Sequence, residues 1–578
     1  MRLFLFSLLM IFPALLLAQS MHQVDTDLTS EWEATGFNNG RAMVRDADGY
    51  FHIVYHTQDN PDSSPGGPCD IWYSHTLIPA PPTISADWAP AVKIVNLPGD
   101  DRYPSIAIEH GSAGVSNDND MLHVVWQHNE GEPGSVYDIF YCSSPNALVP
   151  PPDAWRLASP LHVSAHNSLV PDIDCSLGNI LHVVWQEEDV DPFSEIYYSQ
   201  SPDHGGSWSP FTNISMTLEA NSQMPDVATI IDFPEAPSEY TYCSEVVHVV
   251  WNDDYDTSSP PHILYTFSPD AGISWMPFED VTFISGAYGS DGYPTLTVDR
   301  DDIPHVAWMT YLLPSDPDNP GPYTPGVDPA VVNSFPGPDP GMYGVYLNYI
   351  LYSWRLGAVW SPFETVSGVI GDEEFPSIAV DQYNNLYVAY QNMLVSGDYD
   401  IYQATKVIGG FPWVPACISN DPDHDDFFPS EATKKAGTSS PGFDLTWTKI
   451  DSDGSAGGHG SLAARSSAHE IWFSGNTSYA PPVAIGDSPD GIQVQGLSVY
   501  PNPVLAGAWI FTGESSGLVK IFDLSGRVVF RESIMPNSNG NCFWGAVGSD
   551  GTPLPNGQYI VTLQNGELLE TRSIIVAR

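Results

Sequence analysis

Short runs of alternating apolar and polar residues recur along most of the chain, and they follow one scheme. An apolar run that usually opens with proline is followed by a polar turn and by a second run ending in Trp or Tyr, as in Pro104–Ile108 and Leu122–Trp126. A period of two residues predicts β-strands, and the turn between the runs predicts a hairpin. The first runs begin at Arg41, Pro104, Pro171, Pro225, Pro294, Pro376 and Pro429.

A third apolar run follows in most repeats, beginning at Asp70, Asp138, Glu195, His262, Asp400 and Glu470. Repeats built from short strands predict an array of small sheets rather than one large core. We therefore expect an all-β fold in which residues 21–478 form a seven-bladed β-propeller. Six blades are the alternative, because the seventh repeat lacks a clear fourth strand. We expect residues 23–37 to supply that strand beside Ile471–Phe473.

The two ends of the chain predict export and a second domain. Arg2, an apolar run from Leu3 to Leu17 and the small residues near Ala18 are typical of a signal peptide, assigned to residues 1–20. No other run is apolar enough to predict a transmembrane segment. Residues 479–496 have the composition of a linker, and alternating runs in 497–578 predict a small β-sandwich.

The charge is strongly acidic, with 71 Asp and Glu against 18 Lys and Arg and a net charge of −53. Nucleic-acid binding is disfavoured, because phosphates are neutralised by clusters of Lys and Arg that this chain lacks. Cations, neutral sugars and basic proteins remain compatible partners. The acidity also has a simpler interpretation, namely solubility of an exported β-rich protein.

Two turns between third and fourth strands share the pattern Ser-x-Asp-x-Gly-x-Ser-Trp. The residues that define it are Ser201, Asp203, Gly205 and Trp208, and again Ser268, Asp270, Gly272 and Trp275. Here Asp is expected to accept backbone N–H groups, Gly to supply a positive φ and Trp to plug between sheets. The pattern resembles the Asp-box (BNR) repeats of sialidase-like propellers. The resemblance implies a structural role on the face opposite the active site.

Alternating strand directions place the turns that enter first strands and those that leave second strands on one face. Acids three residues before the strand prolines and aromatic residues immediately before them gather there: Asp101, Tyr103, Asp291, Tyr293, Glu373, Phe375, Asp426 and Phe428. Such side chains suit a sugar or a hard cation such as Ca2+. Asp253, Asp254 and Asp256 are the candidate metal ligands. The alternative is that the acids solvate turns and the aromatic rings wedge between blades.

Active sialidases, which this chain resembles over residues 38–475, bind the sugar carboxylate with three arginines. One of these belongs to a Phe/Tyr-Arg-Ile-Pro motif. No strand proline of this chain is preceded by Arg, and only Arg41, Arg102 and Arg355 are candidates for such a cluster. No catalytic residue is therefore assigned. Histidines such as His123 and His182, which recur in second strands, are expected to be structural.

The last segment resembles the type A C-terminal sorting domain of the bacterial type IX secretion system, which is similar to immunoglobulin-like modules. The matching residues are Pro501, Asn502, Pro503, Asp523, Gly526, Gly557 and Tyr559. The resemblance implies transfer by the type IX secretion machinery and release or attachment at the outer cell surface.

The sequence thus predicts a secreted or surface-displayed propeller that binds a glycan or protein ligand. No cofactor is assigned apart from a possible Ca2+. A sialidase-like glycoside hydrolase and a structural adhesion protein are the alternatives.

Overall fold

The computed structural model describes most of residues 19–476 and the strands of residues 498–576. Its longest undescribed stretches are 1–18, 231–245, 313–346, 452–468 and 477–497. The proline-rich loop around residues 314–340 lies outside the described residues. The chain divides into two compact units, a larger one up to Pro482 (apart from residues 354–361) and a smaller one from Val483.

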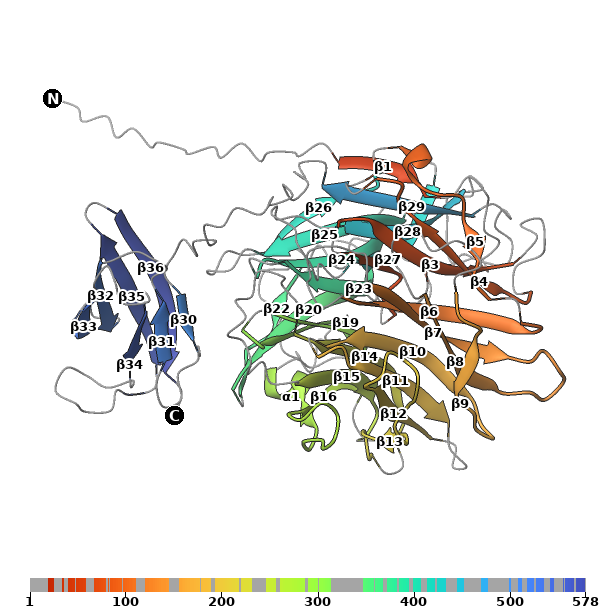
Figure 1. Ribbon diagram of the computed structural model, residues 1–578, viewed down its shortest axis with the longest axis horizontal. Helices are drawn as coiled ribbons and strands as arrows, with labels where there is room; N and C mark the ends of the chain where they lie inside the picture. The colour runs from red at the N-terminus through yellow and green to blue at the C-terminus, as the bar shows by residue number, and fades with distance from the viewer. Residues whose placement is uncertain are drawn as a thin grey trace, which may run out of the picture. The chain divides into compact units, whose positions relative to one another are not determined.

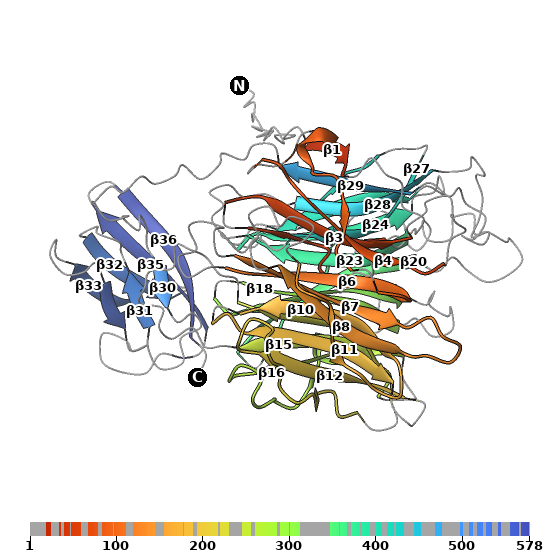
Figure 2. The ribbon, with the colours of Figure 1, turned by 45° about the vertical axis from the view of Figure 1, so that its right-hand side comes forward.

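The larger unit is built almost entirely of antiparallel sheets, as the repeats predict (Figure 1). Sheet 1 contains β2 (Met43–Arg45), β3 (Phe51–Thr57), β4 (Asp70–His75) and β5 (Val92–Lys93). Sheet 2 contains β6 (Asp100–Glu109), β7 (Met121–Asn129), β8 (Tyr137–Ser144) and β9 (Ser159–His162). Sheet 3 contains β10 (Ser168–Cys175), β11 (Leu181–Glu188), β12 (Ser194–Ser201) and β13 (Thr212–Asn213). Figure 2 shows β10, β11 and β12 side by side.

Four further sheets repeat this order. Sheet 4 contains β14 (Ser222–Thr229), β15 (Val247–Asp253), β16 (His262–Ser268) and β17 (Glu279–Asp280). Sheet 5 contains β18 (Ser290–Val298), β19 (Pro304–Leu312), β20 (Leu347–Leu356), β21 (Val359–Trp360) and β22 (Glu364–Thr365). Sheet 6 contains β23 (Asp372–Val380), β24 (Leu386–Met393), β25 (Tyr399–Lys406) and β26 (Val414–Cys417). Sheet 7 contains β27 (His424–Glu431), β28 (Asp444–Asp451), β29 (His469–Asn476) and β1 (Gln19–Gln23).

Helical structure in the described residues is limited to a 3-10 turn, η1 (Ser85–Asp87), and a short helix, α1 (Val281–Ser285). The fold is therefore all-β, as predicted.

The core lies between neighbouring sheets. Val54 of sheet 1 packs in one cluster with Ile106 and Trp126 of sheet 2. Phe473 of sheet 7 and Phe51 of sheet 1 share another cluster, with ring centroids 5.2 Å apart. Sheet 7 therefore packs against sheet 1, although the two are furthest apart in sequence. Burial of apolar area between sheets is the main stabilising term for such a fold.

A circle of hydrogen bonds joins the first strands of all these sheets. The polar side chain one residue after the strand proline accepts the backbone N–H of the next sheet. The bonds are Ser105 to Ile173 (3.4 Å), Asp172 to Val227 (2.9 Å), Asp226 to Leu296 (2.9 Å), Thr295 to Ile378 (3.3 Å), Ser377 to Glu431 (3.0 Å) and Ser430 to Ala42 (3.1 Å). Ala42 has no polar side chain, and the Ile106 N–H instead donates to the Arg41 carbonyl at 2.8 Å. The first strands therefore line the axis of the unit.

The fourth strand of sheet 7 comes from the start of the chain. β1 pairs antiparallel with β29, with Gln23 opposite Trp472, and Val24 N–H donates to the Ile471 carbonyl at 2.8 Å (Figure 1). A strand from this end of the chain was expected beside Ile471, but within residues 23–37. The observed strand ends at Gln23, and most of residues 23–37 lies outside the described residues. β1 also begins inside the segment predicted as a signal peptide.

The smaller unit contains two antiparallel sheets, as its alternating pattern predicts. The first has the order β30 (Ser498–Tyr500), β31 (Ala508–Phe511) and β34 (Asn541–Trp544). The second has the order β33 (Val528–Ile534), β32 (Gly517–Asp523), β35 (Gly557–Asn565) and β36 (Leu568–Val576). Val519, Ile521 and Val561 are fully buried and form part of its core.

Candidate functional site

We call proximal the face of the larger unit at which first strands begin, second strands end and third strands begin. Antiparallel pairing within each sheet puts these three chain ends together. The opposite, distal face carries the turns from third to fourth strands, because these follow the other ends of the third strands.

On the proximal face a strained bulge recurs in six first strands. The pairing register shifts there in sheets 2 to 7, and the residue before the strand proline has a positive φ. The residues are Tyr103, Val170, Met224, Tyr293, Phe375 and Phe428, with φ between 49° and 53°. A non-glycine residue pays about 1–2 kcal/mol for this conformation. Bulges re-aim side chains, and here the same side chain is turned out of the strand in each sheet.

The aromatic residues among these six form what we call the collar: Tyr103, Tyr293, Phe375 and Phe428. The Tyr293 and Phe375 rings meet edge to face, with centroids 4.8 Å apart, and Phe375 and Phe428 follow at 4.7 Å. Three sheets therefore contribute to one continuous row of rings. Phe428 is buried in it, whereas Tyr103, Tyr293 and Phe375 remain partly exposed.

The four acids predicted beside these rings are buried, and three of them accept an indole N–H. Asp101 accepts Trp126 Nε1–H at 2.5 Å, Asp291 accepts Trp308 at 3.1 Å and Asp426 accepts Trp447 at 2.6 Å. In sheets 3 and 4 the acceptor of the indole N–H is an acid two residues after the Trp. Glu187 accepts the N–H of Trp185 and Asp253 accepts that of Trp251, both at 2.9 Å. A buried indole N–H needs an acceptor, and a buried carboxylate needs donors. The pairing therefore gives each indole an acceptor and each carboxylate a donor to one of its oxygens.

Burial raises the pKa of Asp291 to about 6 and that of Asp426 to about 7. Glu373 is also buried, and its carboxylate accepts Ile350 N–H at 3.1 Å. Contact of these four acids with a ligand stays a prediction, and their hydrogen bonds give each of them a structural role.

One acid that the sequence did not single out is better placed. Glu374 lies next to Phe375 and is only partly buried. Its two carboxylate oxygens accept Asn348 Nδ2 at 3.2 Å and Gln391 Nε2 at 3.0 Å. Burial and the nearby charge of Asp372 raise the pKa of Glu374 to about 7. Because Gln391 also accepts the N–H of Phe428 at 3.1 Å, this carboxyl group is tied to the collar.

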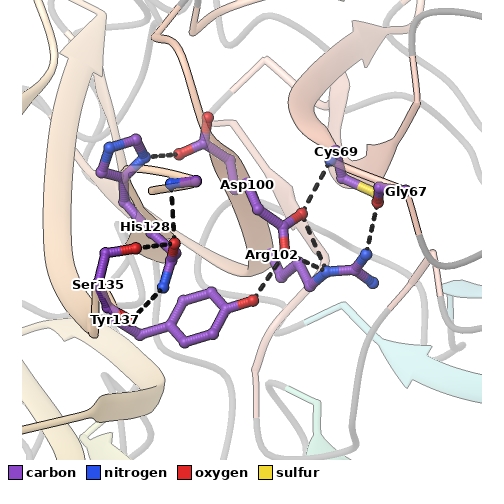
Figure 3. A network of polar contacts seen from close by, with 10 residues as sticks. Gly67, Cys69, Asp100, Arg102, His128, Ser135 and Tyr137 are labelled. Atoms are coloured by element: carbon purple, nitrogen blue, oxygen red, sulfur yellow. Dashed lines mark hydrogen bonds and ion pairs between the residues drawn. The ribbon is translucent and has the colours of Figure 1, made fainter. Parts of the chain in front are cut away.

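Around Tyr103 the proximal face carries a polar network between sheets 1 and 2 (Figure 3). Arg102 Nε donates to both carboxylate oxygens of Asp100, at 2.9 and 3.0 Å, and Arg102 Nη2 donates to the Gly67 carbonyl at 2.7 Å. Asp100 also accepts the Tyr137 hydroxyl at 2.7 Å. Figure 3 shows these groups converging on one carboxylate, which offsets the guanidinium charge locally.

The three arginines considered for a carboxylate clamp have different surroundings. Arg41 is buried at the axis, where Nη1 donates to the Ile378 carbonyl at 2.7 Å and Nη2 to the Leu296 carbonyl at 2.6 Å. Arg102 belongs to the network just described. Arg355 lies at the end of β20 that leads into β21, on the distal side. These three side chains do not gather at one place.

The candidate metal ligands are engaged by other groups. Asp253 is buried and accepts Ser222 Oγ at 2.7 Å and Thr217 Oγ1 at 3.0 Å besides the indole. Asp254 accepts Asn221 Nδ2 at 3.0 Å, and Asp256 lies outside the described residues. In the part of the chain that the structure describes, no group of three or more His, Cys, Asp or Glu is arranged to hold a metal ion. A Ca2+ site stays a prediction.

The histidines of the second strands pair with tyrosines of the third strands. Nδ1 of each lies 2.6–2.7 Å from a hydroxyl: His52 with Tyr73, His123 with Tyr141, His182 with Tyr198, His248 with Tyr265 and His305 with Tyr352. Burial lowers the pKa of His182 to about 3, so this ring is neutral in the core. These contacts give the recurring histidines a structural role.

The two Ser-x-Asp turns lie on the distal face. The Asp203 carboxylate accepts Ser207 N–H at 2.7 Å, and the Trp208 ring packs edge to face against Tyr141 of the preceding sheet at 5.2 Å. Gly205 has φ +78°. The second turn repeats this, with Asp270 accepting Ser274 N–H at 2.8 Å, Trp275 against Tyr198 at 4.8 Å and Gly272 at φ +84°. Ser201 and Ser268 each accept the N–H of the glycine, at 2.9 and 2.7 Å.

In the smaller unit, Tyr559 donates its hydroxyl to the Pro555 carbonyl at 2.9 Å, and Gly557 opens β35. Asp523 ends β32. Pro501, Asn502, Pro503 and Gly526 lie outside the described residues.

Residues 498–577 match the family described as the secretion system C-terminal sorting domain. This module is a type IX sorting domain. It implies handling by the type IX secretion machinery and indicates secretion, often with attachment to the cell surface. No helix among the described residues is long and apolar enough to span a membrane.

No curated protein matches the chain. Among solved structures it is similar to an ulvan lyase of a polysaccharide lyase family, at 7% identity over 78% of this chain and 94% of that one, with a TM-score of 0.49. It is also similar to an arabinanase from Penicillium chrysogenum, at 12% identity over 65% and 92% with a TM-score of 0.38. A Hadza microbial sialidase follows at 11% identity over 62% and 64%, with a TM-score of 0.36. At such scores these likenesses say nothing about the ligand of this chain.

Proposed function

We propose that this chain is an exported seven-bladed β-propeller that binds glycans at the collar on its proximal face. Its sheets are the blades, and the circle of hydrogen bonds between first strands supports closure into one ring. The turns at Asp203 and Asp270 are its Asp-box repeats, and their contacts with Tyr141 and Tyr198 support a structural role. The C-terminal module is an immunoglobulin-like sandwich and a type A sorting domain. A linker at 479–496 joins it to the domain of residues 21–478, whose export it directs.

The observation that carries the glycan proposal is the collar itself. Tyr103, Tyr293 and Phe375 are partly exposed although each sits in a strained backbone conformation. The strain recurs in six sheets, also at the buried Val170 and Phe428, so the partly exposed aromatic rings are what distinguishes these three positions. Concave sites lined by aromatic rings with a few placed polar groups are typical of small-ligand binding.

The net charge of the chain limits the class of glycan that it can bind. A net charge of −53 repels anionic polysaccharides over long range. At the collar the Arg102 guanidinium is already paired with Asp100, so it offers little compensation. A neutral glycan, whose C–H surfaces pack on rings and whose hydroxyls bond Glu374 and Tyr293, meets neither obstacle.

The test is binding of neutral oligosaccharides to the full exported chain by titration calorimetry, after a glycan array has selected them. Tyr293→Ala and Phe375→Ala should each weaken binding about tenfold, since truncating an aromatic anchor costs 1 kcal/mol or more. Ile273→Ala is the control, because this exposed side chain lies in the distal turn of sheet 4. Unchanged affinity in both collar variants, or binding to no neutral glycan, would refute the proposal.

A sialidase-like glycoside hydrolase is the second candidate, favoured by one observation only. A carboxyl group with a pKa of about 7, as in Glu374, stays partly protonated at neutral pH and is suited to general acid catalysis. If the chain hydrolyses the glycan that it binds, Glu374→Gln should abolish turnover and keep affinity within threefold. Turnover that persists in this variant excludes Glu374 as the acid.

Delivery has its own test. Deleting residues 498–577 should leave the propeller folded inside the cell envelope and absent from the medium and the cell surface. Appearance of the truncated chain outside the cell would show that this module is not its export signal.

A further inference from the structure

The outer edge of sheet 4 carries exposed aromatic residues that the collar does not include. We call Tyr255, His262, Phe278 and Phe283 the platform. Tyr255, Phe278 and Phe283 are 39%, 37% and 64% exposed. The Tyr255 ring lies 5.9 Å from Phe278 and 5.6 Å from His262, centroid to centroid. Exposed apolar groups that occur singly are ordinary, but a contiguous set marks an interaction surface.

A single carboxylate holds the platform together. Asp280, the last residue of β17, accepts the Tyr255 hydroxyl at 2.9 Å and lies 2.7 Å from His262 Nδ1 through the same oxygen. Its other oxygen accepts Phe283 N–H at 2.8 Å and Thr282 Oγ1 at 2.9 Å. Burial raises the pKa of Asp280, but these hydrogen bonds outweigh it and lower the pKa below its ordinary value. The rings are therefore fixed before any ligand arrives.

Sheet 4 departs from the other repeats at these positions. At the position of His262, sheets 1, 2, 3, 6 and 7 have an acid, namely Asp70, Asp138, Glu195, Asp400 and Glu470. In sheet 4 an acid lies in the outer strand instead, because Asp280 occupies the position of Asn213 in sheet 3. Phe283 occupies the position of Met216 in sheet 3. The platform is thus a local feature of one sheet and is not required by the repeat.

The platform lies at the proximal end of sheet 4, because β16 begins at His262 and β17 ends at Asp280. Figure 1 shows α1, which carries Phe283, beside β16 at the outer edge of the sheet. Collar residues belong to first strands, whereas the platform surrounds the third and fourth strands of sheet 4: Tyr255 lies between β15 and β16, His262 opens β16, Phe278 precedes β17 and Phe283 is in α1. The collar and the platform share no residue.

We infer that the platform is a second binding site, which takes the apolar face of a neutral polysaccharide. Fixed aromatic rings offer flat apolar area at little entropic cost, and the side-chain nitrogen and oxygen of His262 and Tyr255 supply polar contacts at its border. The platform contains no Lys or Arg, and the chain carries a charge of −53, so an anionic polymer is disfavoured.

A second copy of the chain is the competing occupant. A stable interface between proteins uses about 20–30 residues on each side. Met276, Ile284 and Ile273 are the other exposed apolar residues nearby in sequence. Ile273 and Met276 belong to the distal turn, so only Ile284 in α1 extends the platform, and this small apolar set favours a polysaccharide strand over a stable protein interface.

The test is affinity electrophoresis of the full exported chain in native gels that contain laminarin, xyloglucan or mannan, with alginate as the anionic comparison. The double variant Tyr255→Ala, Phe278→Ala is measured in the native chain and in a Tyr293→Ala, Phe375→Ala background. Because the collar variant has lost the rings of Tyr293 and Phe375, any retardation that it keeps measures binding at the platform. Phe211→Ala is the matched control, because Phe211 occupies the position of Phe278 in sheet 3 and is 54% exposed.

We expect a neutral polysaccharide to retard the collar variant, and the platform substitutions to weaken that binding about tenfold or more. Phe211→Ala should leave it unchanged, and circular dichroism should show native folding in every variant. If the collar variant is not retarded by any neutral polysaccharide, or if adding the platform substitutions to the collar variant leaves its retardation unchanged, the platform inference is wrong. If the collar substitutions by themselves abolish retardation, the proposed function still stands, because binding then depends on the collar. A native dimer that becomes monomeric on platform substitution, seen by sedimentation velocity, assigns the surface to a second copy instead.

Discussion

Replacing the axial arginine should destabilise the larger unit more strongly than any surface change. Arg41 stands where the other repeats have the strand proline, and its guanidinium donates to carbonyl groups of sheets 5 and 6. It also lies close enough to Asp172 and Asp226 to lower the pKa of both. Arg41→Met keeps the apolar stem and removes the charge and both donors.

The size of the effect follows from these contacts. A hydrogen bond to a charged group contributes about 1.5–3 kcal/mol, and Arg41 makes two of them. Its positive charge near the buried carboxyls of Asp172 and Asp226 adds an electrostatic contribution. The two contributions overlap, so we expect a loss of about 4–6 kcal/mol at pH 7.5. Arg41→Lys keeps the charge without the planar fork and should lose about half as much.

The loss should depend on pH. Burial raises the pKa of Asp172 and of Asp226 above their unfolded values, the latter also through the charge of the former. A carboxyl group with a raised pKa destabilises the folded state as pH increases from the unfolded to the folded pKa. Without Arg41 both values rise further, so the penalty grows towards neutral pH. At lower pH more of each carboxyl is protonated, so at pH 4 the loss should be smaller and should come mainly from the lost hydrogen bonds.

Urea unfolding followed by tryptophan fluorescence measures this at pH 4 and pH 7.5. Adding Asp226→Asn to Arg41→Met should restore about 2 kcal/mol at pH 7.5, since the uncompensated charge is removed. An equal loss at both pH values, or no recovery in the double variant, contradicts an electrostatic role for Arg41.

Three further outcomes are expected. Glu374→Gln should raise the thermal midpoint at pH 8 and leave it unchanged at pH 4, because the native carboxyl has its pKa raised to about 7 and ionises at a cost above that pH; a gain of equal size at pH 4 would point to another cause. Gly272→Ala should lower the free energy of unfolding several times more than Gly134→Ala, measured by chemical unfolding. Both glycines have a positive φ, but only at Gly272 would the added Cβ lie 1.9 Å from the Tyr198 hydroxyl. Equal losses would mean that Tyr198 moves aside freely. Mass spectrometry of the exported chain should find an N-terminus no later than Met21, which keeps Met21–Gln23 of β1 in the mature chain; a mature chain starting beyond Gln23 would show that the sheet closes without this strand.

Much of the fold is predictable because each repeat carries its own local signals. The proline, the polar turn and the terminal Trp mark two strands and the hairpin between them, and the all-β prediction is confirmed. The sorting domain is confirmed as well, by residues that match over the whole module. The strand β1 was expected from the incomplete seventh repeat, but its position was misjudged, because a register between distant chain ends leaves no local signal.

The candidate site was harder to predict because burial and partner choice are tertiary properties. Asp101 and Glu374 look alike in sequence, as acids near a strand proline. One is buried under an indole, whereas the other faces the collar between two amides. The bulge at each strand proline breaks the simple alternation of side chains, so the two-residue period does not tell which acid turns inward. For the same reason the collar aromatic residues remain a prediction as ligand contacts.

The pairing of β1 with β29 has a consequence for biogenesis. Sheet 7 is completed by the pairing of residues 19–23 with 469–476, so it stays incomplete until some 450 intervening residues have been made. Until then β1, the strand that is made first, has no partner, and its unpaired edge is a template for mispairing with other chains. The pairing of these two distant segments is therefore the last step in completing the larger unit, and a chain that stops before β29 cannot make it.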